Sequence, residues 1–364
     1  MSGKQPHILY TVLNWGLGHA TRSIPVINEF LRQNVKVSLA GEGDSMFLLR
    51  SEFPTLDHYE IKGVDVRYPR NMPLALAMLL QSFKINKAIN SEHQQFTELA
   101  KKIKPDAIIS DNRYGAYTDG IPSVLICHQL QLKAPTPFRF MEPLLFRFNR
   151  IFLRPFSEIW VPDMEGSENL TGDLSHSSTT LRTLQPEFIG PLSRLKDATI
   201  SDTQKRYDIF VTFSGPEPQR SIFEEQLLLQ LKDLPYSVLM VTGQPQKNSG
   251  RTIGNVDLVP HLTPGELKFH FINSNYIVCR AGHSTLMDLC AFKRSAMVIP
   301  TPGQTEQEYL AGMHAQAGNL VTFAQNKMDI ASGIKNLDRC KPLNLPVNEL
   351  IAPRITRFLK SLNS

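Results

Sequence analysis

Strand-like and helix-like segments alternate along most of this 364-residue chain, and this alternation limits the folds open to it more than any other feature of the sequence. Short runs rich in β-branched and aromatic residues indicate buried strands, and the longer stretches between them have the apolar spacing of helices. Such an alternation favours a mostly parallel, doubly wound sheet, because each helix carries the chain back across the sheet. In the first half, the predicted strands are residues 7–13, 35–40, 107–110, 123–127 and 158–161. The predicted helices between them are residues 21–33, 45–52, 74–104 and 142–156.

The alternation stops after Gly190 and Pro191, at a polar and irregular stretch, and then starts again. The strands predicted after this break are residues 208–213, 237–241, 256–259, 276–279 and 296–299. A chain of this length suits two domains of ordinary size better than one core. We therefore expect an α/β protein with two Rossmann-like, doubly wound βαβ domains. The expected parts are a first domain of residues 1–192, a linker of residues 193–206, a second domain of residues 207–346, and a helix of residues 347–364 that packs back on the first domain.

Composition agrees with a globular protein in a reducing compartment. Hydrophobic residues make up 41% of the chain and charged residues 20%, as in ordinary soluble domains. No apolar run approaches the roughly 20 residues that span a bilayer, and the first residues lead into a strand rather than a secretory signal. The four cysteines are scattered, without the spacing of metal ligands, so we expect reduced thiols and a cytoplasmic location.

The start of one predicted helix in the second half has the features of an anion site. After the strand of residues 276–279, Gly282 permits a sharp turn, and the free amides of His283, Ser284 and Thr285 would point out of the helix end. The helix dipole favours negative charge there, so a phosphate is the expected ligand. The alternative is a capping box between Thr285 and Asp288, which would satisfy the same amides locally.

A polar loop rich in Glu and Gln follows the next predicted strand, over residues 301–308. In open α/β sheets, ligands bind at the carboxyl ends of the strands. Side-chain amides and carboxylates there suit the hydroxyl groups of a sugar, whereas the other interpretation is a solvated turn. The helix start and this loop together favour a phosphorylated ligand that carries hydroxyl groups.

Each half also has a glycine-containing turn after its first strand. In the first, Gly16, Gly18 and His19 lie at a predicted helix start, where the positive helix end lowers the pKa of an imidazole and keeps it ready to accept a proton. The alternative is a packing or capping histidine. In the second turn, Ser214 and Arg220 could meet a phosphate, or form an ordinary helix cap.

Two βα domains, a Gly-x-Gly-His turn and a Cys-Arg-x-Gly segment ending in a Glu/Gln-rich loop together resemble the GT-B glycosyltransferases. The likeness is strongest to the family that contains the peptidoglycan N-acetylglucosaminyltransferase that makes lipid II. It covers nearly the whole chain and implies two domains that face a cleft, the second binding a nucleotide sugar and the first binding the acceptor.

The resemblance implies roles for residues of the second domain. Those implied to bind the donor diphosphate are Ser214, Gly215, His283, Ser284, Thr285 and Arg194. Those implied to bind the nucleoside are His261, Leu262 and Asp288, and those implied to bind the donor sugar are Gln307 and Glu308. Asp288 replaces a glutamate of the family and Glu308 a glutamine, so a different donor sugar is expected. Pro216 and Pro218 remove amides from the glycine turn, which weakens a direct phosphate role for that loop.

The implied reaction is a single inverting displacement by a hexosyltransferase-type enzyme. His19 would lie near the acceptor hydroxyl as the catalytic base, and the donor would be a nucleoside diphosphate sugar, with UDP as the expected nucleotide. No acidic metal-binding motif is present, so we expect no cofactor and no metal. The candidate acceptor contacts, which lie in glycine turns or follow two strands at one sheet edge, are Gly16, Gly18, Asp111, Asn112, Arg113, His128 and Gln129. The alternative for the last five is polar loop residues that close the sheet.

Residues 137–156 interleave four arginines with six phenylalanines and several leucines. Such a helix can lie in a membrane interface, which would suit a lipid-linked or glycan acceptor of the cell envelope and peripheral membrane association. The alternative is a helix packed on the sheet, with arginines that extend to water.

Two other classes of function share the donor half. A nucleotide-sugar hydrolase or 2-epimerase of the same fold would use no acceptor, and a sensor would bind the nucleotide sugar without turnover. Nucleic-acid binding fits poorly, because the basic residues are interleaved with apolar ones and no recognition motif is present.

Overall fold

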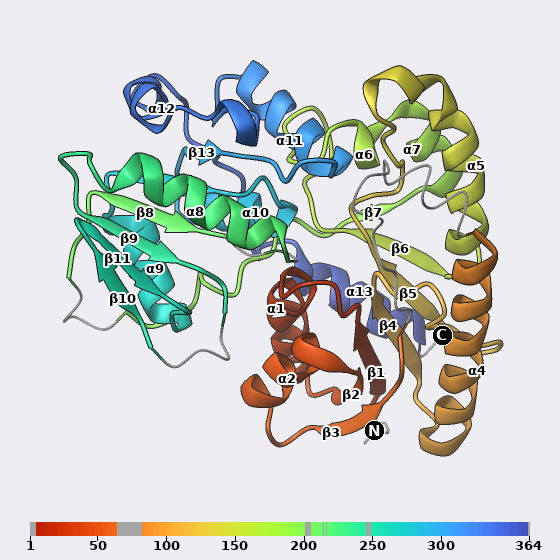
Figure 1. Cartoon of the computed structure of the whole chain (residues 1–364). Helices are drawn as coiled ribbons and strands as arrows, with labels where there is room; N and C mark the ends of the chain where they lie inside the picture. The colour runs from red at the N-terminus through yellow and green to blue at the C-terminus, as the bar shows by residue number, and fades with distance from the viewer. Residues whose placement is uncertain are drawn as a thin grey trace. The chain divides into compact units, whose positions relative to one another are not determined.

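The computed structural model of the chain describes residues 5–63, 82–200, 205–213, 215, 217–244 and 249–362 (Figure 1). The chain divides into two compact units, one of Met1–Leu192 with Asn348–Ser364 and one of Ser193–Val347. Within the described residues, each unit is built on a sheet of seven strands, and all neighbouring strands but one pair are parallel. The prediction of two doubly wound α/β sheets is therefore confirmed.

The sheet of the first unit has the strand order β3-β2-β1-β4-β5-β6-β7, and all its pairs are parallel. Its strands are β1 (His7–Val12), β2 (Lys36–Gly41), β3 (Asp57–Glu60), β4 (Ala107–Asp111), β5 (Ser123–Ile126), β6 (Glu158–Val161) and β7 (Glu187–Phe188). Its helices are α1 (Gly18–Arg32), α2 (Gly43–Glu52), α4 (Ser82–Ile103), η1 (Thr136–Met141), α5 (Glu142–Leu153), α6 (Asp173–His176), α7 (Ser178–Leu184) and α13 (Ile351–Leu362). The first part of the predicted helix 74–104 lies outside the described residues.

The centre of this sheet is fully buried, as expected for strands covered on both faces. All six residues of β1 and all five of β4 are buried. Their neighbouring positions bring Val12 beside Asp111 at the carboxyl edge of the sheet. This edge therefore receives the polar residues that follow β1, β4 and β5.

The sheet of the second unit has the order β10-β11-β9-β8-β12-β13-β14, and β10 alone is antiparallel. Its strands are β8 (Ile209–Thr212), β9 (Val238–Val241), β10 (Arg251–Ile253), β11 (Val256–Val259), β12 (Tyr276–Cys279), β13 (Met297–Val298) and β14 (Val321–Thr322). Its helices are α8 (Gln219–Leu231), α9 (Pro264–Asn273), α10 (His283–Ala291), α11 (Thr305–Gln316), η2 (Gln325–Lys327) and α12 (Ile330–Leu337). Residues 193–200, which we expected in a linker, are part of this unit.

One face of the second sheet packs against α8 and α12. Phe223 and Leu227 of α8 share a buried cluster with Ile330 and Ile334 of α12 and with Met297 of β13. Figure 1 shows α8 in front of the sheet and α9 behind it. Right-handed crossovers require this, because α8 connects β8 to β9 in one direction along the sheet and α9 connects β11 to β12 in the opposite direction. Of the described helices, none is long and apolar enough to cross a bilayer.

Helix α13 belongs to the first unit. Arg354 donates to Glu158 of β6 and pairs with Glu187 of β7 at 2.9 Å. Phe358 meets the Trp160 ring edge to face, with 5.5 Å between the ring centroids. The last described helix therefore covers one face of the sheet at β6 and β7.

Candidate functional site

His19 lies in the first turn of α1, which begins at Gly18, three residues earlier than predicted. No side chain caps this helix, so its free amides and positive end lie close to the imidazole. Gly16, in the turn before it, has a φ of 74°, a left-handed conformation that favours glycine. The turn between β1 and α1 thus presents His19 at the carboxyl edge of the sheet.

Asp111, the last residue of β4, is the partner of His19. The imidazole Nδ1 of His19 lies 2.6 Å from Oδ1 of Asp111, whose side chain is fully buried. Arg22, one helical turn after His19, donates from Nε to Oδ2 of Asp111 at 2.7 Å and from Nη2 to Oδ1 at 2.5 Å. Arg22 also donates from Nη1 to Nδ1 of His128 at 3.0 Å. Two histidines, one carboxylate and one guanidinium therefore form a single buried network.

The charges in this network fix the protonation of His19. Burial would raise the pKa of Asp111, but Arg22 and then His19 outweigh it and lower that pKa to about 2. An ionised carboxylate only accepts, so Nδ1 of His19 donates to Asp111 and Nε2 is left as a proton acceptor. Burial, and then Arg22, lower the pKa of His19, against the opposing effect of Asp111. His19 is thus a neutral, oriented base at neutral pH.

The other candidate acceptor contacts of the first unit differ in their surroundings. Asn112 is partly exposed in a left-handed conformation, and its buried Oδ1 has no partner among the described residues. Gln129 is partly exposed beside His128 at the end of β5. Arg113 is 2% exposed and donates to Glu92 at 2.7 Å, which supports the alternative of a residue that closes the sheet.

In the second unit, the start of α10 is open. Gly282 is its N-cap, and no side chain caps it. The capping box considered for Thr285 and Asp288 is absent, so that alternative is wrong. By contrast, α9 is closed by a capping box between Thr263 and Glu266, directly after His261 and Leu262. His283, Ser284 and Thr285 therefore form the first turn of a helix that has no side-chain cap among the described residues, as an anion site at a helix start requires.

Asp288, one turn into α10, points to the segment that leads into the second unit. The hydroxyl of Ser193 donates to Oδ1 of Asp288 at 2.6 Å. Burial raises the pKa of Asp288 to about 6, although Ser193 and the charge of Arg194 act against it. The structure thus brings together Arg194, Asp288 and the start of α10, three elements that the sequence analysis assigned to one nucleotide.

Arg280, between β12 and α10, is a buried cation that the sequence analysis did not single out. It donates to the carbonyl groups of Ile299 at 3.1 Å, Pro300 at 3.3 Å and Gln219 at 3.4 Å, and it lies 3.7 Å from the ring centroid of Phe223. Burial lowers its pKa to about 9. Arg280 therefore ties together the ends of β12 and β13 and the start of α8.

The glycine turn after β8 is only partly described. Ser214 lies outside the described residues, and Gly215 is exposed with a φ of 138°. Arg220 pairs with Glu217 and, at 3.2 Å, with Glu224. Its charge is thus neutralised within α8 and the turn, and the prediction that Arg220 meets a phosphate is not supported.

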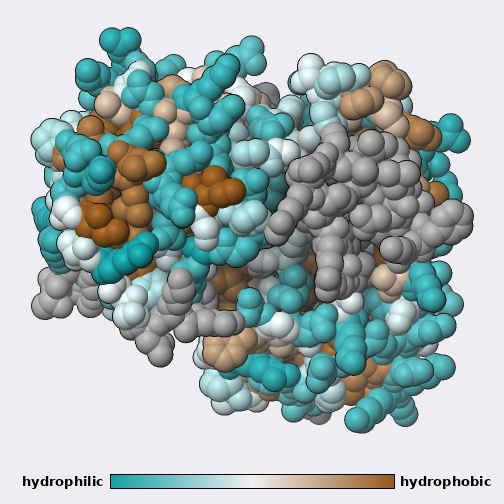
Figure 2. All heavy atoms as spheres, in the orientation of Figure 1, coloured by the Kyte–Doolittle hydropathy of each residue, from teal (hydrophilic) through white to brown (hydrophobic). Residues whose placement is uncertain are grey.

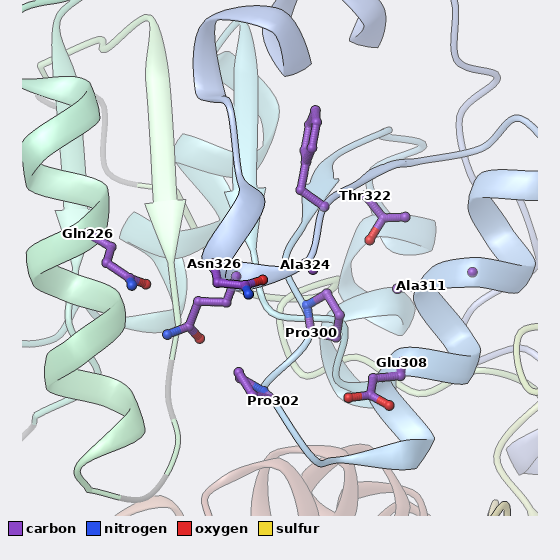
Figure 3. A pocket seen from close by; sticks show the side chains of 11 residues that line it. Gln226, Pro300, Pro302, Glu308, Ala311, Thr322, Ala324 and Asn326 are labelled. Atoms are coloured by element: carbon purple, nitrogen blue, oxygen red, sulfur yellow. The ribbon is translucent and has the colours of Figure 1, made fainter. Parts of the chain in front are cut away.

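Gln307 and Glu308 lie in the first turn of α11 and have different surroundings. Gln307 accepts from the amide of Thr301 at 2.9 Å and donates to Gln304 at 2.5 Å, so it holds the preceding loop in shape. Glu308 is exposed, accepts from the amide of Gly303 at 3.1 Å and lines a cavity of about 560 Å³ (Figure 3).

Three residues of these clusters were missed by the sequence analysis: Arg22, Ser193 and Arg280. Arg22 had a usable signal, because its spacing of three from His19 puts both on one face of a helix. Ser193 had no such signal, because its partner Asp288 lies 95 residues away in sequence. Arg280 had none either, because its partners lie about 20 and about 60 residues away.

Comparisons with known proteins agree with this arrangement. Residues 6–131 match the family model described as glycosyl transferase family 1, and residues 220–346 match the C-terminal domain of glycosyltransferase family 28. A protein of Methanosarcina mazei, described as an uncharacterized glycosyltransferase, is 23% identical over 97% of both chains.

Solved structures share the fold at low identity. MurG of Acinetobacter baumannii superposes with a TM-score of 0.56 at 15% identity, over 98% of this chain and 99% of MurG. An Arabidopsis thaliana protein in complex with UDP-L-rhamnose superposes with a TM-score of 0.59 at 13% identity, over 99% of this chain and 95% of that one. The predicted resemblance to GT-B proteins is confirmed.

Proposed function

We propose that this chain, which has the GT-B fold, is a glycosyltransferase that transfers a hexosyl group from a UDP-linked sugar to an acceptor hydroxyl with inversion. The observation that carries this proposal is the pair of His19 and Asp111, a neutral imidazole held by a buried carboxylate. A hydroxyl is a poor nucleophile until a base removes its proton, and a base held in one tautomer does so efficiently.

The reaction is a single displacement. Nε2 of His19 takes the proton of the acceptor hydroxyl while the oxygen bonds to the anomeric carbon of the donor sugar. The bond from that carbon to the phosphate oxygen breaks, and its electrons leave with the nucleoside diphosphate. One displacement inverts the anomeric configuration.

The second unit supplies the groups that suit the departing diphosphate. The uncapped amides of α10 and the charge of Arg194 would stabilise the negative charge on the leaving group, and Asp288 would accept from the ribose hydroxyls. The uridine nucleotide is supported by the solved neighbour that binds UDP-L-rhamnose.

We also propose that transfer needs no metal ion, because the positive end of α10 and Arg194 would stabilise the charge of the leaving group. EDTA should therefore leave the rate unchanged.

The acceptor is proposed to be a lipid-linked sugar or a glycan at a membrane surface. On η1 and α5, Phe138, Phe140, Leu144 and Ile151 are 41–77% exposed, and hydrophobic side chains reach the surface over this part of the chain at the upper right of Figure 2. The arginines of the same segment that are exposed are Arg139, Arg147 and Arg154. Exposed apolar side chains among arginines suit an anionic membrane interface.

The deciding experiment incubates the protein with a panel of UDP-sugars, with and without lipid-linked and soluble sugar acceptors. We expect UDP release that depends on acceptor and on His19, with a glycosylated product of inverted configuration by NMR. Acceptor-independent release of free sugar or an epimer would instead assign the hydrolase or 2-epimerase. Donor binding without turnover under all conditions would assign a sensor.

A further inference from the structure

The cavity beside Glu308 has walls that suit an uncharged ligand. It is lined by residues of α8, of the loop after β13, of α11, and of the segment that runs from the end of β14 into η2. Figure 3 shows Gln226 of α8 and Glu308 of α11 entering it from opposite sides, with Pro300 and Pro302 between them. Its volume of about 560 Å³ lies inside the range of small-molecule pockets, roughly 300–1,000 Å³.

Two carboxamide oxygens of residues that line this cavity lack hydrogen-bond partners among the described residues. Gln325 is 6% exposed, and its Oε1 is buried without a hydrogen bond to any described residue. The buried Oε1 of Gln226 likewise has no hydrogen bond to any described residue. Buried polar groups in folded proteins are nearly always satisfied, and each exception calls for a ligand, a water or another explanation. A third carboxamide, that of Asn326, lines the same cavity.

The chemistry of the lining selects the class of ligand. A carboxamide donates and accepts, as a hydroxyl group does, so three of them match a polyhydroxylated molecule. None of the described residues that line the cavity is a lysine or an arginine, and Glu308 brings a negative charge to it, so an anion is disfavoured. Prolines, alanines and Phe323 supply apolar surface for the C–H faces of a sugar ring.

We propose that this cavity binds a neutral saccharide through Gln226, Gln325 and Asn326. The site is separate in its residues from the diphosphate and nucleoside contacts, and only Glu308 is shared with the residues assigned to the donor sugar. The saccharide is either a free sugar or glycan, or the glycosyl group of the donor itself.

The test is a titration of the full-length protein with glucose, N-acetylglucosamine and glucuronate, followed by ligand-observed NMR and calorimetry. We expect the neutral sugars to bind and glucuronate to bind much more weakly. Gln325→Leu and Gln226→Leu should each weaken neutral-sugar binding about tenfold, the usual effect of losing a buried hydrogen-bond partner. Gln316→Leu, the same substitution at an exposed position of α11, is the matched control and should bind like wild type.

Stability separates a ligand site from a structural amide. Because the buried Oε1 of Gln325 accepts no hydrogen bond from a described residue, Gln325→Leu should melt at the same temperature as wild type or higher. A large drop would assign Gln325 to the fold and overturn the proposal. Wild-type protein that binds no neutral sugar, or that binds glucuronate equally well, would also overturn it, and so would unchanged binding in both leucine variants.

A second arm identifies the source of the saccharide. If the donor glycosyl group fills the cavity, Gln325→Leu weakens binding of UDP-glucose but not of UDP. If a separate sugar fills it, free-sugar binding persists when UDP-glucose is bound. The first titration needs no nucleotide, so its failure leaves the proposed transferase reaction untouched.

Discussion

Nδ1 of His19 lies 2.6 Å from Oδ1 of Asp111, and the same carboxylate is held by Arg22. The carboxylate therefore has two tasks: it orients the imidazole and it neutralises a buried guanidinium. A substitution at Asp111 should consequently affect both turnover and stability, whereas one at His19 should affect turnover alone.

His19→Ala should reduce the rate of transfer by about 10²–10⁴, the usual contribution of a positioned base. Binding of UDP, measured by calorimetry, should stay unchanged because the nucleotide contacts are assigned to the other unit. His58→Ala, on β3 of the same unit, is the control and should retain full turnover. Unchanged turnover in His19→Ala would remove His19 from the mechanism.

Asp111→Asn should lower the free energy of unfolding of the first unit by about 3–5 kcal/mol, because it leaves the cation of Arg22 buried without its carboxylate. Asp57→Asn is the comparison: its pair with Lys36 is about half exposed and should contribute at most about 1 kcal/mol. Urea titration followed by circular dichroism measures both. Equal effects of the two substitutions would contradict the role given to the buried network.

Acid should destabilise the first unit through the same carboxylate. The pKa of Asp111 is lowered to about 2 in the folded chain, against about 3.9 in an unfolded one. Between these values the unfolded chain binds more protons, so the stabilisation is complete above about pH 4 and is lost as the pH falls through 2. Unfolding curves between pH 5 and pH 2 should show this loss in wild type, and Asp111→Asn should lack that part of it.

Asp288→Asn should weaken UDP binding about tenfold, because a carboxylate accepts hydrogen bonds from ribose hydroxyls more strongly than an amide. The substitution keeps an acceptor for Ser193, so the fold should tolerate it. The control is the dideoxy nucleotide, which lacks both ribose hydroxyls and should bind wild type and variant alike. Calorimetry that finds the same loss for both nucleotides would assign Asp288 a role other than ribose recognition.

Vesicle flotation tests the membrane surface on η1 and α5. A double variant, Phe140→Ser with Arg147→Ser, should lose binding to vesicles that contain anionic lipid at low salt. Phe47→Ser with Arg50→Ser removes an equally exposed phenylalanine and an exposed arginine from α2, and it should bind like wild type. No flotation of wild type, or equal loss in both double variants, would refute the assignment.

The central strands were predictable because their apolar runs are long enough to stand out, as in β1 and β4. The short strands β7, β13 and β14, which lie at or next to a sheet edge, have two residues each, too few to define a periodicity. Of these three, only β13 was predicted, as the longer segment 296–299. Sheet pairing rather than local pattern decides where such short segments become strands.

The candidate site shows the same limit. The sequence predicted His19 as the catalytic base and Asp111 as a contact to the acceptor substrate. It did not predict that the two side chains pair with each other. Their pairing follows from β1 and β4 being neighbours in the sheet, although β2 and β3 lie between them in sequence. The spacing between Thr285 and Asp288 suggested a capping box. In the structure, Asp288 instead accepts a hydrogen bond from the hydroxyl of Ser193, 95 residues away in sequence.

Helix α13 gives the first unit an order of assembly. Residues 193–347 are synthesised before the chain can supply Arg354 and Phe358, so a ribosome completes the second unit first. Until then this face of β6 and β7 lacks its cover, and Trp160 lacks the ring of Phe358. The first unit therefore completes its packing only after α13 has been translated, more than 150 residues after Leu192.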